Sequence, residues 1–190
     1  MRIGVLALQG AFIEHINMLE KLGQEAFEIR NCNDLTGGFD AIILPGGEST
    51  VIGKLLAELN MIDIIKEKIL HGMPVLGTCA GMILLAKKIE GNEKTYFATM
   101  DITVKRNAYG RQMGSFYTDD YFNGAITEMR FIRAPYVSEC GKNIEVLSAV
   151  DDKTVAVRHG NQLAVAFHPE LTADTSVHEY FLQMVRLYLS

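Results

Sequence analysis

Short, continuous apolar runs alternate with longer amphipathic stretches through the first half of this 190-residue chain. Such alternation is typical of strand-helix-strand units, which pair into a parallel sheet covered by helices. The runs lack the polar alternation of half-exposed strands, so they predict strands that are buried on both faces. The predicted strands are residues 3–8, 26–30, 41–44 and 74–76, and the predicted helices are residues 12–22, 50–59, 62–70 and 80–88.

The second half changes character, because shorter β-type segments follow one another there without long helices. We expect them to be antiparallel additions to the sheet. An amphipathic helix is predicted over residues 176–189, and its apolar stripe is interpreted as core. No repeat or linker divides the chain, which predicts one α/β domain over residues 1–190. The β-type segments are residues 102–105, 129–133, 144–150, 154–158 and 163–167.

Composition excludes several classes of function. With 48% hydrophobic and 22% charged residues the chain has the make-up of a folded globular protein. The 18 Lys and Arg against 23 Asp and Glu give a net charge of −5, which argues against nucleic acid as partner. No apolar run has signal or membrane-spanning length. Cys32, Cys79 and Cys140 show neither disulfide nor metal spacing. We therefore expect a cytoplasmic protein without membrane attachment, metal or cofactor.

The sharpest motif is Gly77-Thr78-Cys79-Ala80-Gly81, between the predicted strand at 74–76 and the following helix. Glycines around a central nucleophile allow the strained strand-to-helix turn called a nucleophile elbow. The helix N-terminus favours the thiolate form of Cys79, which attacks carbonyl carbon. A buried cysteine that only packs is the other interpretation.

His168-Pro169-Glu170 follows directly after the predicted strand at 163–167. Histidine is the expected base for a cysteine nucleophile, and an acid two residues later can hold its imidazole. Alone, this tripeptide is more typical of a capped turn. Together with the elbow it predicts a Cys79, His168 and Glu170 triad.

A third turn, Pro45-Gly46-Gly47-Glu48-Ser49, also lies between a strand and a helix. Adjacent glycines free the backbone to present an N–H, so we expect the amides of Gly47 and Ala80 to stabilise an oxyanion. A plain tight turn is the alternative. In open α/β sheets such loops gather at the carboxyl edge, where ligands bind.

At this point the residues resemble a known family, the class I (triad) glutamine amidotransferases, and most closely its glutaminase subunits of pyridoxal 5′-phosphate synthase. The resemblance covers nearly the whole chain and implies a three-layer, flavodoxin-like fold with a mostly parallel sheet. The matching motifs are Leu6-Ala7-Leu8-Gln9-Gly10, Leu44-Pro45-Gly46-Gly47-Glu48-Ser49-Thr50, Gly77-Thr78-Cys79-Ala80-Gly81, Arg106-Asn107-Ala108-Tyr109-Gly110-Arg111-Gln112, Phe131-Ile132-Arg133-Ala134-Pro135 and His168-Pro169-Glu170-Leu171.

The resemblance implies hydrolysis of L-glutamine to glutamate and ammonia through a glutamyl thioester on Cys79, with His168 as base and acid and Glu170 as its orienter. It also implies a glutamine pocket, and a guanidinium there suits the substrate carboxylate. A solvated charged loop is the other interpretation of Arg106. The implied pocket residues are Gly47, Glu48, Ser49, Arg106, Ile132 and Arg133.

The implied partner is a synthase subunit built as a (β/α)8 barrel, in a complex of twelve synthase and twelve glutaminase subunits. Docking of that subunit would complete the oxyanion turn at Gly46 and Gly47. Two alternatives stay open: an amidotransferase subunit of another pathway, and a non-enzymatic redox or chaperone-like protein whose elbow cysteine is oxidised.

Overall fold

A ten-stranded sheet runs through the centre of the computed structural model, which describes residues 1–92, 94–106 and 114–190. Its strand order is β2-β1-β3-β4-β12-β11-β9-β6-β5, with β10 paired to β11. The strands are β1 (Arg2–Leu6), β2 (Glu25–Ile29), β3 (Ala41–Leu44), β4 (Val75–Thr78), β5 (Ala86–Ile89), β6 (Met100–Lys105), β9 (Tyr136–Cys140), β10 (Glu145–Val150), β11 (Lys153–His159) and β12 (Gln162–Val165). The pair β7 (Ser115–Phe122) and β8 (Ala125–Ile132) forms a second sheet.

The central strands confirm the predicted parallel sheet. Neighbouring strands are parallel from β2 through β1, β3 and β4 to β12, whereas β11, β10 and β9 add antiparallel pairs. Every residue of β3, β4 and β12 is buried, as two-sided coverage by helices requires. The fold is therefore α/β with antiparallel additions, as expected. The segment at 163–167 differs from the prediction, because it forms β12, which pairs in parallel with β4 as well as antiparallel with β11.

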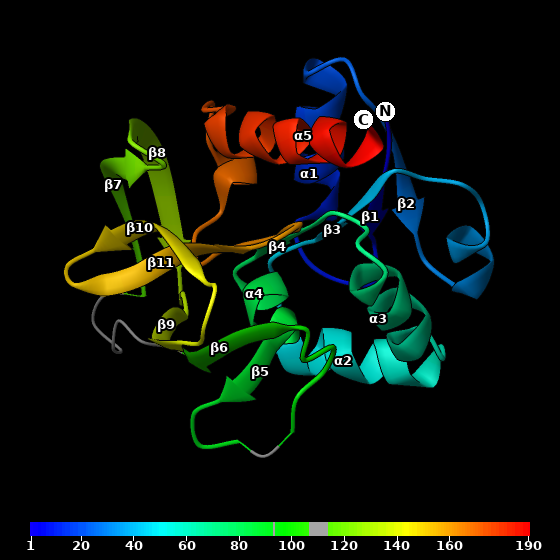
Figure 1. Cartoon of the computed structure of the whole chain (residues 1–190), viewed down its shortest axis with the longest axis horizontal. Helices are drawn as coiled ribbons and strands as arrows, with labels where there is room; N and C mark the ends of the chain where they lie inside the picture. Colours follow the sequence, from blue (N-terminus) through cyan, green and yellow to red (C-terminus); the bar gives the residue numbers. More distant parts are fainter. Residues whose placement is uncertain (93, 107–113) are drawn as a thin grey trace.

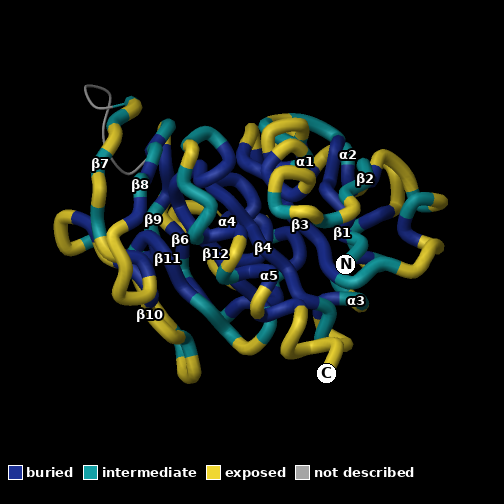
Figure 2. Tube along the Cα trace, turned by 90° about the horizontal axis from the view of Figure 1, so that it is seen from above, coloured by how far each residue is buried: buried dark blue, intermediate teal, exposed yellow. Residues whose placement is uncertain are grey.

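Helices cover both faces of this sheet. Figure 1 shows α1 (Phe12–Lys21) and α5 (Ser176–Leu189) on one side, and α2 (Ser49–Glu58), α3 (Ile62–Leu70) and α4 (Ala80–Leu85) on the other. In Figure 2 the buried segments run through the middle of the molecule, and exposed residues gather at the outer turns. Over the described parts of the chain, none of the helices has the length and apolar character to cross a membrane.

The apolar stripe predicted on the last helix is confirmed as core for most of its residues. Val177, Phe181, Met184 and Val185 are buried in α5. Tyr188 is 44% exposed, so the stripe leaves the core before the helix ends.

The helix predicted over residues 80–88 is too long. It ends at Leu85, and the chain continues at once as strand β5. The carbonyls of Leu84 and Leu85 accept hydrogen bonds from Phe97 and Thr99 instead of from a next helical turn. The apolar pattern alone could not distinguish these partners, because they lie in a later segment.

The segment at 129–133 is the end of the longer strand β8, which pairs with β7 in the separate sheet rather than with the central one. The predictions also missed β7 and β9. The sequence did contain a hairpin signal, the pair Asn123-Gly124. Both residues adopt positive φ in the turn that joins β7 to β8. The other predicted helices and strands agree with the structure to within two residues at each end.

Close backbone packing explains both elbow glycines. A Cβ on Gly81 would overlap the carbonyl oxygen of Leu44 at the end of β3, and a Cβ on Gly77 would approach the Gly81 carbonyl group to 2.7 Å. These are backbone atoms, which cannot rotate away as a side chain can. The two glycines therefore let β3, β4 and α4 meet where Cys79 lies.

We expect Gly81→Ala to lower the free energy of unfolding by about 2 kcal/mol or more, because overpacking against backbone leaves no relaxed position. Thermal unfolding followed by circular dichroism measures the change. Gly38→Ala is the control, since a Cβ there meets no atom within 4 Å. Equal melting temperatures for the two variants would contradict this account of the elbow.

Candidate active site

Cys79 occupies the predicted elbow. It is the N-cap residue of α4 with φ 48° and ψ −98°, a left-handed conformation that is strained for a residue with a side chain. Its N–H donates to the carbonyl of Val165 on the neighbouring strand β12 (2.8 Å), which holds the turn in place. The sulfur lies 3.9 Å from the carbonyl oxygen of Ile132, and the residue is 6% exposed. A strained strand-to-helix turn that carries the nucleophile is the defining feature of an elbow.

His168 lies just beyond the end of β12, before the short helix η2 (Pro169–Leu171). Its N–H donates to the carbonyl of Arg130 on β8 (2.8 Å), which ties the second sheet to this turn. The ring atom Nδ1 is 2.7 Å from Oε1 of Glu170. Both side chains are almost fully buried. The acid two residues after the histidine thus holds its ring, as the sequence predicted.

The side chain of Cys79 also acts on the ring of His168. Burial by itself would lower the pKa of His168. The interactions with Cys79 and Glu170 outweigh burial and raise that pKa to about 10. The imidazole therefore carries its proton at neutral pH. The structure brings all three predicted residues, Cys79, His168 and Glu170, into one cluster.

The glycine turn lies directly against this cluster. A Cβ on Gly46 would overlap the imidazole of His168, so only glycine fits there. The Gly46 carbonyl accepts from the N–H of Ala11 (3.1 Å), and the Glu48 N–H donates to Oε1 of Gln9 (2.8 Å). In a trans peptide the N–H of Gly47 points opposite to the Gly46 carbonyl, hence away from Ala11. The sequence prediction missed the anchoring role of Gln9.

The remaining predicted pocket residues are placed unequally. Ser49 is buried at the start of α2, and Glu48 is exposed as its N-cap residue. Arg133, with φ 45°, follows Ile132, whose carbonyl faces the Cys79 sulfur. Strain of this kind concentrates at functional sites.

Within the described residues, no contact joins Arg106 to the triad. Burial raises the pKa of Tyr96, and the positive charge of Arg106 opposes part of that rise. A Cβ on Gly53, one turn after Ser49 in α2, would overlap Tyr96, so this ring packs against α2. The rest of its motif, including Arg111, lies outside the described residues.

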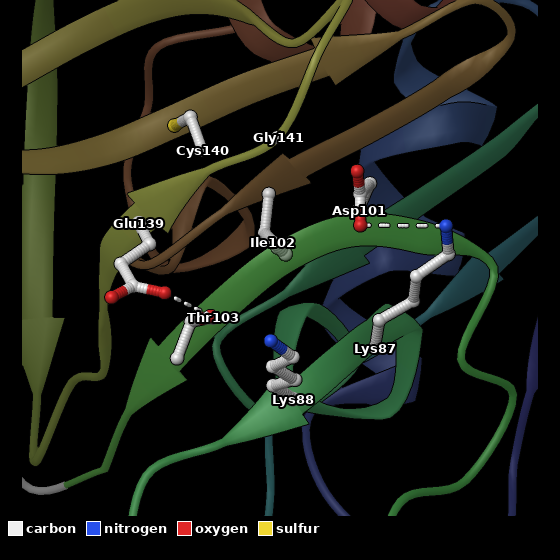
Figure 3. A pocket seen from close by; sticks show the side chains of 8 residues that line it. All are labelled: Lys87, Lys88, Asp101, Ile102, Thr103, Glu139, Cys140 and Gly141. Atoms are coloured by element: carbon white, nitrogen blue, oxygen red, sulfur yellow. Dashed lines mark hydrogen bonds and ion pairs between the residues drawn. The ribbon is translucent and has the colours of Figure 1, made fainter.

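A pocket opens elsewhere, between β5, β6 and β9 (Figure 3). Lys87 pairs with Asp101 (3.4 Å), and the Thr103 hydroxyl donates to Glu139 (3.0 Å). No triad residue lines this pocket, so it is not the candidate active site.

Two further histidines, which belong to no motif, also lie near the triad. His15 and His178 are fully buried and contact each other, with His15 Nδ1 2.9 Å from His178 Nε2. His15 Nε2 lies 3.2 Å from the Thr78 hydroxyl and 3.4 Å from Oε2 of Glu170. Residues this far apart in sequence give no local signal.

The fold and this site define a class of protein. A cysteine elbow beside a histidine and glutamate pair, on a mostly parallel sheet with antiparallel additions, is the architecture of class I glutamine amidotransferases. A solved structure described as a glutamine amidotransferase has a TM-score of 0.91 and 45% identity, and the match covers 96% of this chain and 98% of that chain.

The chain belongs to the SNO glutamine amidotransferase family, whose model matches residues 5–187. It is 59% identical to the pyridoxal 5′-phosphate synthase subunit PdxT of Methanocorpusculum labreanum, over 97% of this chain and 98% of that protein. It is 52% identical to the PdxT subunit of Haemophilus influenzae, over 98% of this chain and 100% of that protein.

The buried histidines predict how stability depends on pH. Burial lowers the pKa of His178 from 6.5 to about 4, so the unfolded chain takes up a proton between these values while the folded chain does not. The free energy of unfolding should fall from pH 6.5 to pH 4, by about 3 kcal/mol from His178. His15, whose pKa is also lowered, acts in the same direction. His168 does not contribute to this change, since the stability that its raised pKa contributes is complete below about 6.5 and is lost only as the pH rises towards 10.

Urea unfolding of His178→Asn at several pH values measures the contribution of His178 to the free energy of unfolding. The variant should lose about 1.4 kcal/mol less per pH unit than the wild-type chain in this window. His71→Asn, at an exposed histidine, is the control. An unchanged slope in His178→Asn would rule out His178 as the source.

Proposed function

We propose that this chain hydrolyses L-glutamine to L-glutamate and ammonia as a single domain over residues 1–190, and passes the ammonia to a pyridoxal 5′-phosphate synthase subunit. The observation that carries the proposal is the cluster of Cys79, His168 and Glu170, with the nucleophile on a strained elbow. Covalent acyl transfer needs this set of groups: a nucleophile, a proton carrier and an acid that orients the carrier.

In the first half-reaction the Cys79 thiolate attacks the side-chain amide carbon of glutamine. The amides of Gly47 and Ala80 stabilise the oxyanion that forms on the carbonyl oxygen. The intermediate collapses by breaking its C–N bond, and the imidazolium of His168 gives its proton to the leaving nitrogen. Ammonia departs, and a glutamyl thioester remains on Cys79.

In the second half-reaction neutral His168 takes a proton from water, whose oxygen attacks the thioester carbon. The C–S bond breaks, glutamate leaves, and the pair of thiolate and imidazolium is restored. Glu170 accepts the Nδ1 proton of His168 in a hydrogen bond throughout, so Nε2 is the atom that exchanges protons.

The amino-acid end of glutamine would lie against Gly47, Glu48 and Ser49 on one side and Ile132 and Arg133 on the other. The exposed carboxylate of Glu48 suits the substrate ammonium group. We assign the substrate carboxylate to Arg106, because a guanidinium can bind it with two parallel hydrogen bonds.

The relatives' names support the choice of partner, since two PdxT subunits align with this chain over nearly their full length. In this proposal a second protein consumes the ammonia. We propose that this second protein, the synthase subunit, is a (β/α)8 barrel. Twelve synthase and twelve glutaminase subunits form a complex in the cytoplasm, and docking of the synthase subunit completes the turn at Gly46 and Gly47.

We expect Cys79→Ala to abolish glutamate release, measured from L-glutamine with the purified chain alone and with the synthase subunit. The loss should be at least about 1,000-fold, because the covalent route disappears. Cys140→Ala is the matched control, since Cys140 is a free, exposed cysteine. Release that persists in Cys79→Ala would overturn the mechanism.

The same assay separates the alternatives. Cys79-dependent release that rises with the synthase subunit supports both reaction and partner, whereas release that the synthase leaves unchanged supports another pathway. Oxidation of Cys79 by peroxide, without glutamate release and without labelling by a glutamine-like electrophile, would support the non-enzymatic alternative.

Arg106→Met should raise the KM for glutamine about tenfold or more and change kcat little, because it removes a charged contact made equally in ground and transition states. Lys94→Met is the control, as the Lys94 ammonium also lies near Tyr96, 5.9 Å from the ring centre. Steady-state kinetics measure both. A KM raised equally in the two variants would point to Tyr96 packing instead of substrate binding.

A further inference from the structure

His15 is a fully buried histidine that the mechanism above leaves without a role. It lies in α1, far in sequence from Cys79 and from Glu170. One of its ring nitrogens nevertheless lies between the residue before Cys79 and the carboxylate of Glu170. Nε2 is 3.2 Å from the hydroxyl of Thr78, the residue before Cys79, and 3.4 Å from Oε2 of Glu170. Nδ1 is 2.9 Å from Nε2 of His178 in α5.

The chemistry of these neighbours fixes where the protons are. Burial, together with the charges of His178 and His168, lowers the pKa of His15 well below 6.5, so the ring is neutral and has one N–H. A carboxylate can only accept, so we place this N–H on Nε2, which lies between the Thr78 hydroxyl and Glu170 Oε2. The bare Nδ1 then accepts from the Nε2–H of His178.

The same assignment of protons also accounts for His178, the histidine farther from Glu170. With its proton on Nε2, His178 has a bare Nδ1, and that atom is buried without a hydrogen-bond partner in the described parts of the chain. Because Nδ1 then carries no proton, no N–H group of His178 is buried without an acceptor. The N–H dipoles of both histidines thus point towards Glu170.

Glu170 needs such a neighbour. Its Oε1 accepts from His168, whereas its Oε2 is buried and receives no well-aligned hydrogen bond within the described residues. A buried carboxylate oxygen without compensation is costly, and the polar N–H edge of His15 is the group that faces it.

We propose that His15 is a positioning residue for glutamine hydrolysis, which holds Glu170 by its second oxygen and the Thr78 end of β4 by its hydroxyl. This rests on the proposed triad. One ring nitrogen then fixes the distance between the turn that carries the acid and the strand that carries the nucleophile. If Glu170 turned, the hydrogen bond that orients His168 would be lost, and proton transfer with it.

The test compares His15→Gln and His15→Met in the complex with the synthase subunit. A glutamine side chain can place an N–H close to the position of Nε2, whereas methionine fills the space without a donor. We expect His15→Met to lower kcat on the order of 10- to 100-fold while the KM for glutamine stays within about twofold, as for other groups that orient a catalytic side chain. His15→Gln should recover most of kcat.

Thr99→Val is the matched control for the loss of a buried hydrogen bond. Thr99 donates to Gln162 (2.7 Å) at the start of β12, the end of that strand opposite to His168. A purely structural His15 would behave like Thr99, with a lower melting temperature and unchanged kcat in the folded complex. That result in His15→Met, or equal kcat losses in His15→Met and His15→Gln, would overturn the proposal.

Cys79→Ala in the same assay keeps the two proposals separate. If it retains activity, the triad mechanism fails and His15 has no reaction to support. If it is inactive while folded His15→Met keeps the wild-type kcat, the triad stands and only the role of His15 is refuted.

Discussion

The site depends on how closely three backbone segments approach one another at the end of β4. Gly77 and Gly81 leave no side chain between β3, β4 and α4, and the carbonyl of Leu44 occupies the space that a Cβ on Gly81 would need. This contact fixes the start of α4, and the turn before it forces Cys79 to a φ of 48°. The strain on Cys79 is offset by packing elsewhere, since the whole of α4 is buried. The sulfur of the proposed nucleophile is therefore held by backbone geometry rather than by its own side-chain contacts.

Sheet topology then decides what can reach that sulfur. Strands β4 and β12 are parallel neighbours with Thr78 opposite Val165, so the chain leaves both strands at the same edge. Because β12 ends at this edge, the chain that leaves it places His168 just beyond the edge. The backbone N–H of His168 donates to the carbonyl of Arg130 on β8, which holds it there. The second sheet is thus part of the site: it supplies Ile132 above the sulfur and anchors the histidine. Helices alone, which cover the faces of the sheet, could not provide these contacts at its edge.

Much of this could be predicted from the sequence because the signals are local. Apolar runs and glycine turns indicated the parallel core, and Cys79 and His168 each lie within three residues of the end of a recognisable strand, with Glu170 two residues after His168. Two of the failures share a physical cause, since they depend on contacts between distant segments. The end of α4 is set by Phe97 and Thr99. The β7–β8 hairpin, in contrast, is local, and its turn signal was overlooked. His15 carries no motif at all, and only the folded chain brings it to Glu170.

The charges of the buried cluster favour one arrangement of protons. Glu170 lies between two histidines, and their pKa values shift in opposite directions: that of His168 rises to about 10, whereas that of His15 falls. Both rings are buried, but His168 hydrogen-bonds to Glu170 and interacts with Cys79, and these two partners raise its pKa. Burial and the neighbouring rings of His178 and His168 lower the pKa of His15. The proposed acyl transfer needs one proton beside the sulfur, and repulsion between the two rings favours a proton on His168 alone.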